Sequence, residues 1–259
     1  MENYIKLRQK PIDGVLTINK NINMRDIKSI HINNIKMEDL NREYDIYASD
    51  YEDLICDIVI ELKKPINCCR LFFNCDDIIT IDLSKFDTSK VTDMSGMFSR
   101  CSKLTSIEFS DNFDTSKVTD MNNMFYYCSG LTELDLSSFD TSNVINMSSM
   151  FNNCSSLTSL DLNHFDTFNV EDFMHMFWNC NNLITLDISN FNINKENTFI
   201  KNMIKCDKLK TLNIKNIKIN ENNKYLPNFL ENIKNIQNIV INPKNNLSLY
   251  RKLKEVKYK

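Results

Sequence analysis

Six cysteines recur at a nearly constant interval along this chain. The steps between them are 26, 27, 26, 26 and 26 residues, and the six are Cys75, Cys101, Cys128, Cys154, Cys180 and Cys206. Self-similarity at such a period is the sequence signature of a solenoid. One unit cannot bury its apolar faces alone, whereas stacked copies form a continuous core. The chain is therefore predicted to be a repeat protein.

The residues that follow these cysteines predict a short strand in each unit. The pattern L-x-x-L-x-L-x-x-F occupies Leu131, Leu134, Leu136 and Phe139 and returns in the same frame from Ile78, Leu157 and Leu183. The alternating L-x-L core places two side chains on one face of a strand and the residue between them on the other.

The second half of each unit predicts a short helix. Asp140-Thr141-Ser142 supplies side-chain oxygens of the kind that cap helices. The apolar residues then recur every three to four positions, at Val144, Met147, Met150/Phe151 and Cys154, which is the spacing of an apolar helical stripe. The fold class expected is an α/β solenoid with one short parallel strand and one short helix per repeat of about 26 residues.

The repeat weakens toward both ends of the chain. Residues 1–64 are expected to form an N-terminal cap with degenerate repeats, because Ile27, Ile30, Ile32 and Ile35 match the strand frame. Residues 65–245 are expected to form the solenoid. Residues 246–259 carry Leu249 and Leu253 at helical spacing and predict a C-terminal cap.

Composition excludes several classes of function. A net charge of -3 gives no electrostatic footprint for nucleic acid. No stretch approaches the ~18 apolar residues of a membrane span, and the N-terminus does not read as a signal peptide. The chain has three histidines and no nucleophile elbow, phosphate loop or zinc-protease helix. We therefore expect a protein that is not an enzyme and has no cofactor or metal.

Three strings resemble one known repeat family. FDTSKVTDMSGMFSRC (from Phe86), FDTSKVTDMNNMFYYC (from Phe113) and FDTSNVINMSSMFNNC (from Phe139) closely resemble the BspA-type leucine-rich-repeat surface proteins. The same repeat occurs in mycoplasma lipoproteins as a domain of unknown function. The resemblance implies a right-handed leucine-rich-repeat solenoid, display on a cell surface, adhesion to host proteins, and no catalytic residues to carry over.

The cysteines allow three interpretations. Their place at the end of an apolar stripe indicates buried thiols that act as small hydrophobic groups, and Ile233 occupies the same slot. Stacked neighbours could instead form disulfides, since bridged α-carbons need only ~4.4–6.8 Å. A zinc site from Cys56, Cys68, Cys69 and Cys75 is a further alternative, although their spacing is not a paired C-x-x-C pattern.

Two sets of residues are candidates for a binding surface. An acidic column stands between the inward residues of each strand, and it is either a solvated polar face or a strip for a basic segment or divalent cations. Its members are Asp82, Glu108, Asp135, Asp161 and Asp187. In the second set, aromatic residues and histidines replace polar ones, which indicates a local binding patch or drift on a tolerant surface. These residues are His164, Phe168, His175 and Trp178, with Tyr126 in the slot of Trp178.

The function expected from these features is a non-catalytic scaffold for protein binding or adhesion. The alternative is an architectural protein whose repeats self-associate. We expect a monomer with a protein partner, at the cell surface or secreted by resemblance, or in the cytoplasm in view of the missing signal and anchor.

Overall fold

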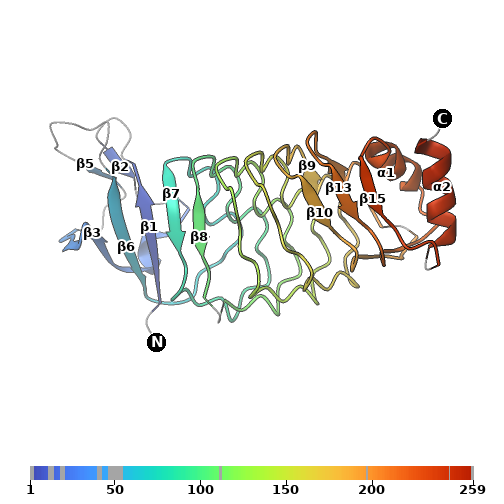
Figure 1. The fold of residues 1–259 in the computed structure, drawn as a ribbon. Helices are drawn as coiled ribbons and strands as arrows, with labels where there is room; N and C mark the ends of the chain where they lie inside the picture. The colour runs from blue at the N-terminus through green and yellow to red at the C-terminus, as the bar shows by residue number, and fades with distance from the viewer. Residues whose placement is uncertain are drawn as a thin grey trace.

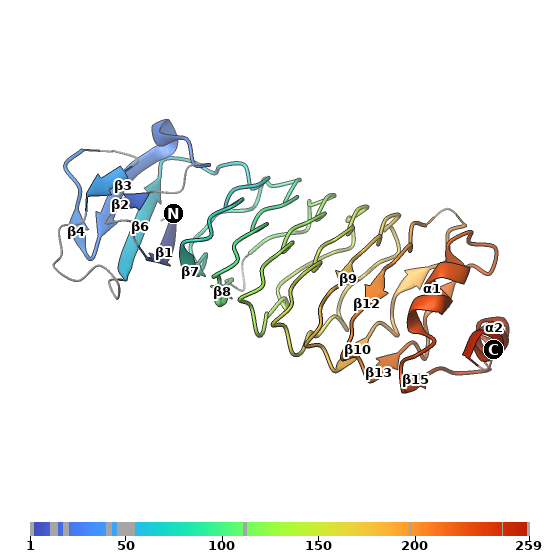
Figure 2. The ribbon, with the colours of Figure 1, turned by 90° about the horizontal axis from the view of Figure 1, so that it is seen from above.

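Successive turns of the chain stack side by side to form a β-solenoid of about six turns (Figure 1). This computed structural model describes residues 3–10, 15–17, 21–39, 43–45, 55–110, 113–196, 198–244 and 246–257. An antiparallel sheet lies at the N-terminal end of the stack, and two helices lie at the C-terminal end (Figure 2). The stacked repeats predicted from the cysteine spacing are therefore confirmed.

One wall of the solenoid carries the L-x-L segments, which we call the strand wall. It includes the parallel pair β7 (Ile78–Asp82) and β8 (Ser106–Glu108) and the parallel set β10 (Thr185–Asp187), β13 (Thr211–Asn213) and β15 (Asn238–Val240). Between β8 and β10, residues 131–136 and 157–162 follow the same frame without forming regular strands. The outer leucines of each of these frames remain buried, so the core continues across the interruption.

The opposite wall, which we call the turn wall, corrects one prediction. Among the described residues from 66 to 206, the helix expected in each repeat is absent. Residues 94–97 and 98–101 instead form two successive turns, closed by hydrogen bonds from Met97 N to Met94 O at 3.2 Å and from Cys101 N to Phe98 O at 3.1 Å. The third residue of each turn has a positive φ, +60° at Gly96 and +65° at Arg100. Type II turns have this feature.

The same pair of turns recurs in successive coils. Residues at the third position are held at positive φ in each of them, namely Arg70, Asn74, Asn123, Tyr127, Ser149, Asn153, His175, Asn179 and Asn202. Backbone hydrogen bonds join each pair of turns to the next coil, as from Phe98 N to Met124 O at 2.9 Å. A helix would keep its hydrogen bonds within one coil, whereas these turns direct alternate N–H groups to the neighbour. A short parallel pair on the later coils continues this wall, β9 (Phe177–Trp178) with β12 (Ile204–Lys205). A second pair, β11 (Asn192–Ile193) with β14 (Lys218–Ile219), lies at the bend that precedes the turn wall.

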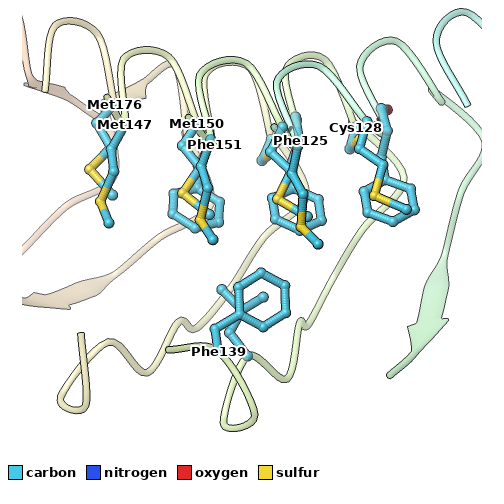
Figure 3. Packing of buried hydrophobic residues seen from close by; sticks show 14 of the residues in the cluster. Phe125, Cys128, Phe139, Met147, Met150, Phe151 and Met176 are labelled. Atoms are coloured by element: carbon cyan, nitrogen blue, oxygen red, sulfur yellow. Dashed lines mark hydrogen bonds between the residues drawn. The ribbon is translucent and has the colours of Figure 1, made fainter. Parts of the chain in front are cut away.

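The core between the two walls is built from columns of identical side chains. Five phenylalanine rings from successive coils stack at centroid distances of 5.4 to 5.7 Å, with interplanar angles of at most 11°. They are Phe72, Phe98, Phe125, Phe151 and Phe177. Figure 3 shows Phe125 and Phe151 in adjacent coils, with Phe139 approaching from the other side of the core. Offset or stacked ring pairs contribute about 0.5–1.5 kcal/mol each beyond the burial of their area.

The N-terminal end is closed by antiparallel strands. The sheet continues from β7 through β1 (Tyr4–Gln9), β6 (Cys56–Leu62), β3 (Ile27–Ile32) and β4 (Ile35–Lys36). The isoleucine frame at Ile27 thus forms a strand, but β3 runs antiparallel to both of its neighbours, unlike a strand of the repeat. Because β1 pairs with β7, it covers an edge of the parallel ladder that would otherwise be open to another chain.

Smaller elements complete the N-terminal sheet. β2 (Val15–Thr17) pairs antiparallel with β5 (Glu43–Asp45). A short 3₁₀ helix, η1 (Met24–Asp26), precedes β3 and is capped by the Asn23 side chain, which accepts from Arg25 N at 3.0 Å. Within the predicted cap of residues 1–64, residues 46–54 lie outside the described part of the chain.

The C-terminal end is closed by two helices. α1 (Leu226–Ile233) buries its apolar stripe of Leu226, Phe229, Leu230 and Ile233. α2 (Leu247–Lys257) buries Leu249 and Leu253 and packs against α1. These residues cover the last coil, so the apolar core does not end at solvent.

Candidate functional site

A shallow groove crosses the strand wall where the ladder of strands is interrupted. Two adjoining depressions, of about 460 and 490 Å³, share Ser159, Leu160 and Asp161. We call their combined lining the strand-face groove, which runs across the coils from β8 to β15. The other residues that line it are Ser106, Ile107, Glu133, Leu134, Asp135, Asn163, Thr185, Leu186, Asp187, Thr211, Asn213 and Val240.

The groove combines an acidic rim with an apolar floor. Four carboxylates line it (Glu133, Asp135, Asp161 and Asp187), and none of the described residues that line it is a lysine or an arginine. Leu134 and Leu160 are only partly buried and form the apolar floor. The sequence placed Asp135, Asp161 and Asp187 in one column, and the structure brings these three together in the groove.

Backbone amides fix the orientation of these carboxylates. Asp135 Oδ1 accepts from Ser137 N at 2.9 Å, Asp161 Oδ1 accepts from Asn163 N at 2.9 Å, and Asp187 Oδ1 accepts from Ser189 N at 2.8 Å. Hydrogen bonding from Ser137, chiefly from its backbone N–H, holds the pKa of Asp135 below its ordinary value. The negative charge on Asp135 is therefore maintained down to a lower pH than for a free carboxyl.

The remaining members of the acidic column lie outside the groove lining. Asp82 is paired with Lys6 of β1 at 2.9 Å. Burial opposes ionisation of Asp82, but hydrogen bonds from Ser84 and Lys6 outweigh it and lower the pKa of this carboxyl. Glu108 is exposed at the end of β8, next to the groove residues Ser106 and Ile107.

The aromatic and histidine positions do not form one patch. His175 and Trp178 contact each other edge to face at 5.0 Å, and Lys205 Nζ lies 4.5 Å from the Trp178 ring centroid. His175 Nε2 lies 3.3 Å from Asn202 Nδ2. Burial first, and then the nearby Lys201 charge, lower the pKa of His175. This group is on the turn wall.

The other predicted positions of that set lie apart from Trp178. His164 follows the strand wall, where its Nε2 bonds to Leu136 O at 2.8 Å. Phe168 is 63% exposed at the bend before the turn wall. Tyr126 occupies the slot of Trp178 two coils earlier, with the buried Asn152 between them.

Tyr126 instead lines a separate cleft on the turn wall, which the sequence analysis missed. This cleft, of about 360 Å³, is lined by Cys69, Arg70, Phe73, Ser95, Gly96, Ser99, Arg100, Asn122, Asn123 and Tyr126. The available signal was Gly96, one of three glycines in the chain, at a position where other coils carry Asn123, Ser149 or His175.

The cysteine column is a row of buried hydrogen-bond donors. All nine cysteines lie among the described residues and are free thiols. Five of them donate to the carbonyl oxygen of a stacked phenylalanine one coil earlier, at 2.9 to 3.0 Å: Cys101, Cys128, Cys154, Cys180 and Cys206. Burial raises the pKa of Cys154 to about 12. Burial likewise raises the pKa of Cys101 and Cys128. These three buried thiols are therefore protonated at neutral pH and are inert as nucleophiles.

The four cysteines considered for a zinc site, Cys56, Cys68, Cys69 and Cys75, do not come together in the structure. In the part of the chain that the structure describes, no three His, Cys, Asp or Glu side chains come close enough to hold a metal ion. Cys56 lies buried in β6, and Cys69 instead contacts Ser95, with 3.2 Å between Sγ and Oγ.

Comparison with known families assigns the repeat. Residues 66–159 and 106–217 match the family described as Mycoplasma protein of unknown function, DUF285. The two matches overlap and together span more than half of the chain. The chain belongs to the DUF285 family. No curated protein and no solved structure matched it.

The DUF285 match contains nearly the whole strand-face groove. Of the groove residues, only Val240 lies beyond residue 217. The turn-wall cleft also falls within the match, from Cys69 to Tyr126. None of the helices in the described ranges is long and apolar enough to cross a bilayer.

Proposed function

We propose that this DUF285 protein is a non-catalytic scaffold that binds an extended, positively charged protein segment along the strand-face groove. The observation that carries the proposal is the lining of the groove, in which four carboxylates and no basic residue surround half-buried leucines. Complementary charge speeds encounter and selects against acidic partners.

The groove supplies apolar contact as well as charge. Leu134 and Leu160 present part of their side chains to solvent, and Val240 is 37% exposed at the far end. An occupant that covers these groups removes apolar surface from water, which contributes about 25 cal/mol per Å². We therefore expect the bound segment to contain aliphatic residues among its lysines and arginines.

The scaffold holds this surface in one arrangement before binding. Each coil is tied to its neighbours by backbone hydrogen bonds on the turn wall, and the groove carboxylates are tied to backbone amides. A preorganised surface loses little conformational entropy when a partner binds. The resemblance to BspA-type surface proteins supports a binding role of this kind, including adhesion.

The test uses selection from a random peptide library on the native chain. We expect the enriched peptides to carry net positive charge. A triple variant with Asp135→Asn, Asp161→Asn and Asp187→Asn removes three charges, but it keeps an acceptor for each backbone amide. Asn146 already plays that role in this chain, accepting from Ser148 N at 3.0 Å.

The selected peptides should bind the triple variant about tenfold more weakly, which corresponds to about 0.5 kcal/mol per lost charge contact. The matched control is Asp87→Asn with Asp166→Asn, because these carboxylates bond Ser89 N and Phe168 N in the same way but lie outside the groove. The control should bind as the native chain does. Enrichment of acidic or neutral peptides, or equal binding to the triple variant, contradicts the proposal.

A further inference from the structure

The turn-wall cleft is built by three small residues in one coil between larger residues in its neighbours. Ser95, Gly96 and Ser99 line it from this coil. Phe73 in the preceding coil and Tyr126 in the following coil occupy the same turn position as Ser99, so two aromatic side chains flank the small one. The cleft therefore depends on these small side chains within an otherwise regular wall.

Gly96 is required for space rather than for its backbone angle. Its φ is +60°, yet Asn123 and Ser149 adopt φ values of +53° and +54° at the same position in the next coils. A Cβ added at Gly96 would meet Arg70 Cγ at 3.3 Å and would narrow the floor of the cleft. The glycine therefore provides room for the Arg70 side chain to lie across the coil.

Two arginines define the charge of the cleft. Arg70 Cζ lies 5.6 Å from the Phe73 ring centroid, which holds the guanidinium at the rim, and Arg100 lies in the same lining. Among the described residues, neither arginine is paired with a carboxylate. The carboxylates two residues before the lining residues Ser95 and Asn122 bond their backbone amides: Asp93 Oδ1 accepts from Ser95 N at 2.8 Å, and Asp120 Oδ1 accepts from Asn122 N at 2.9 Å.

Neutral polar groups complete the lining. Ser95, Ser99, Asn122 and Asn123 all belong to this lining, and Ser99 is only 3% exposed. Asn122 Nδ2 donates to Asp120 Oδ1 at 2.6 Å, and Asn123 Nδ2 donates to Asn122 Oδ1 at 2.6 Å. These hydrogen bonds fix the orientation of the two amides before a ligand binds.

We propose that this cleft binds a small polar ligand with one oxyanion group, of the size and chemistry of a single acidic sugar unit. The two guanidinium groups match a carboxylate or similar oxyanion, because a planar guanidinium can donate two parallel hydrogen bonds to the two oxygens of such a group. Serine hydroxyls and asparagine amides match sugar hydroxyls, and the Phe73 and Tyr126 rings match the apolar face of a sugar ring. A volume of about 360 Å³ suits one such ring.

The test is a ligand-observed NMR titration of the full chain with glucuronate, glucose and inorganic sulfate. Glucuronate should bind with a Kd on the order of 1 mM, as is typical of a single small polar ligand, and glucose should bind at least tenfold more weakly. Arg100→Gln should weaken glucuronate binding at least tenfold.

Gly96→Asn should abolish glucuronate binding while keeping the fold, because Asn123 occupies the equivalent position with the same backbone. Ser149→Asn is the matched control, at the same position one coil beyond the cleft, and it should bind as the native chain does. Peptide binding in the strand-face groove should be unchanged by Gly96→Asn. The proposal for the cleft and the proposal for the groove are therefore tested independently.

Four results would overturn the proposal. Equal affinity for glucose and glucuronate would show that the arginines do not contribute to binding. Sulfate binding as tight as that of glucuronate would reduce the site to a bare oxyanion site. Absence of glucuronate binding, or unchanged binding by Gly96→Asn, would exclude the cleft as the site.

Discussion

The thiol of Cys154 donates a hydrogen bond of 3.0 Å to the carbonyl oxygen of Phe125, one coil earlier in the stack. The same oxygen also accepts from Cys128 N at 3.1 Å, the bond that closes the second turn of its own coil. The carbonyl oxygens of Phe72, Phe98 and Phe151 likewise accept one hydrogen bond within their coil and one from the next coil. The cysteine column therefore links neighbouring repeats through hydrogen bonds, in addition to filling space in the core.

Truncation of Cys154 should separate these two roles. Cys154→Ser keeps a donor for Phe125 O, whereas Cys154→Ala removes it and leaves a small gap. We expect the alanine variant to be less stable than the serine variant by about 1 kcal/mol, the usual net contribution of one hydrogen bond. Urea unfolding followed by circular dichroism measures the difference. Equal stability of the two variants would mean that the thiol only fills space.

The protonated thiols should make the fold sensitive to alkaline pH. Burial raises the pKa of Cys68 and of Cys154 from an ordinary value of 9.0 to about 12. Above pH 9 the unfolded chain loses these protons while the folded chain keeps them, so the free energy of unfolding should fall between about pH 9 and 12.

Unfolding at pH 8 and pH 10.5 checks this expectation. Lysine and tyrosine also titrate in this range, so the comparison is with Cys154→Ser, whose hydroxyl does not. The native chain should lose more stability than the variant. An identical loss in both would show that Cys154 does not contribute.

The phenylalanine column should account for much of the packing energy in the middle coils. Phe125 is fully buried between Phe98 and Phe151, at 5.4 and 5.7 Å. Phe125→Ala should lower the free energy of unfolding by about 3–5 kcal/mol. The exposed Phe168 provides the control, since Phe168→Ala should change it by less than about 0.5 kcal/mol. Similar losses in both variants would contradict the assigned core.

The single tryptophan reports on its histidine neighbour. Trp178 contacts His175, whose pKa is lowered from 6.5 by burial and by Lys201. Protonation of His175 should therefore quench Trp178 fluorescence with a midpoint below pH 6.5, and His175→Asn should abolish the transition. Because the unfolded chain takes up this proton first, stability should also fall as the pH drops below about 6.5. A midpoint at or above 6.5 would contradict the described contact.

The repeat and its core were accessible from the sequence because both depend on spacing alone. The residues placed inward by the cysteine register, such as Met94, Met97 and Phe98, are fully buried. The error lay in the backbone that carries them. Steps of three, one and three residues place side chains on one face of a helix, and two successive type II turns do the same.

The distinguishing signal lay in the residues between the apolar ones. Asparagine tolerates a left-handed backbone, and Asn74, Asn123, Asn153, Asn179 and Asn202 all have positive φ. The sequence pattern predicts a helix cap at Asp140-Thr141-Ser142. The buried threonines Thr115 and Thr141 instead bond the next coil, where their Oγ1 atoms donate to Asp140 O at 2.9 Å and to Asp166 O at 3.0 Å.

The candidate site was predictable only in part, for a related reason. A column of acidic residues follows from register, so Asp135, Asp161 and Asp187 could be grouped from the sequence. The groove depends on where the strand ladder is interrupted, which local spacing does not encode. The turn-wall cleft requires contacts between Arg70 and Gly96 in different coils, and those contacts exist only in the stacked structure.

The most direct test of the proposed binding role is hydrogen–deuterium exchange of the native chain with and without a selected basic peptide. If the peptide binds in the strand-face groove, its addition should slow exchange in residues 131–137, 157–163 and 185–189. Exchange on the turn wall between residues 94 and 101 should not change. Protection confined to the turn wall or to the terminal caps would contradict the assignment of the groove as the binding surface.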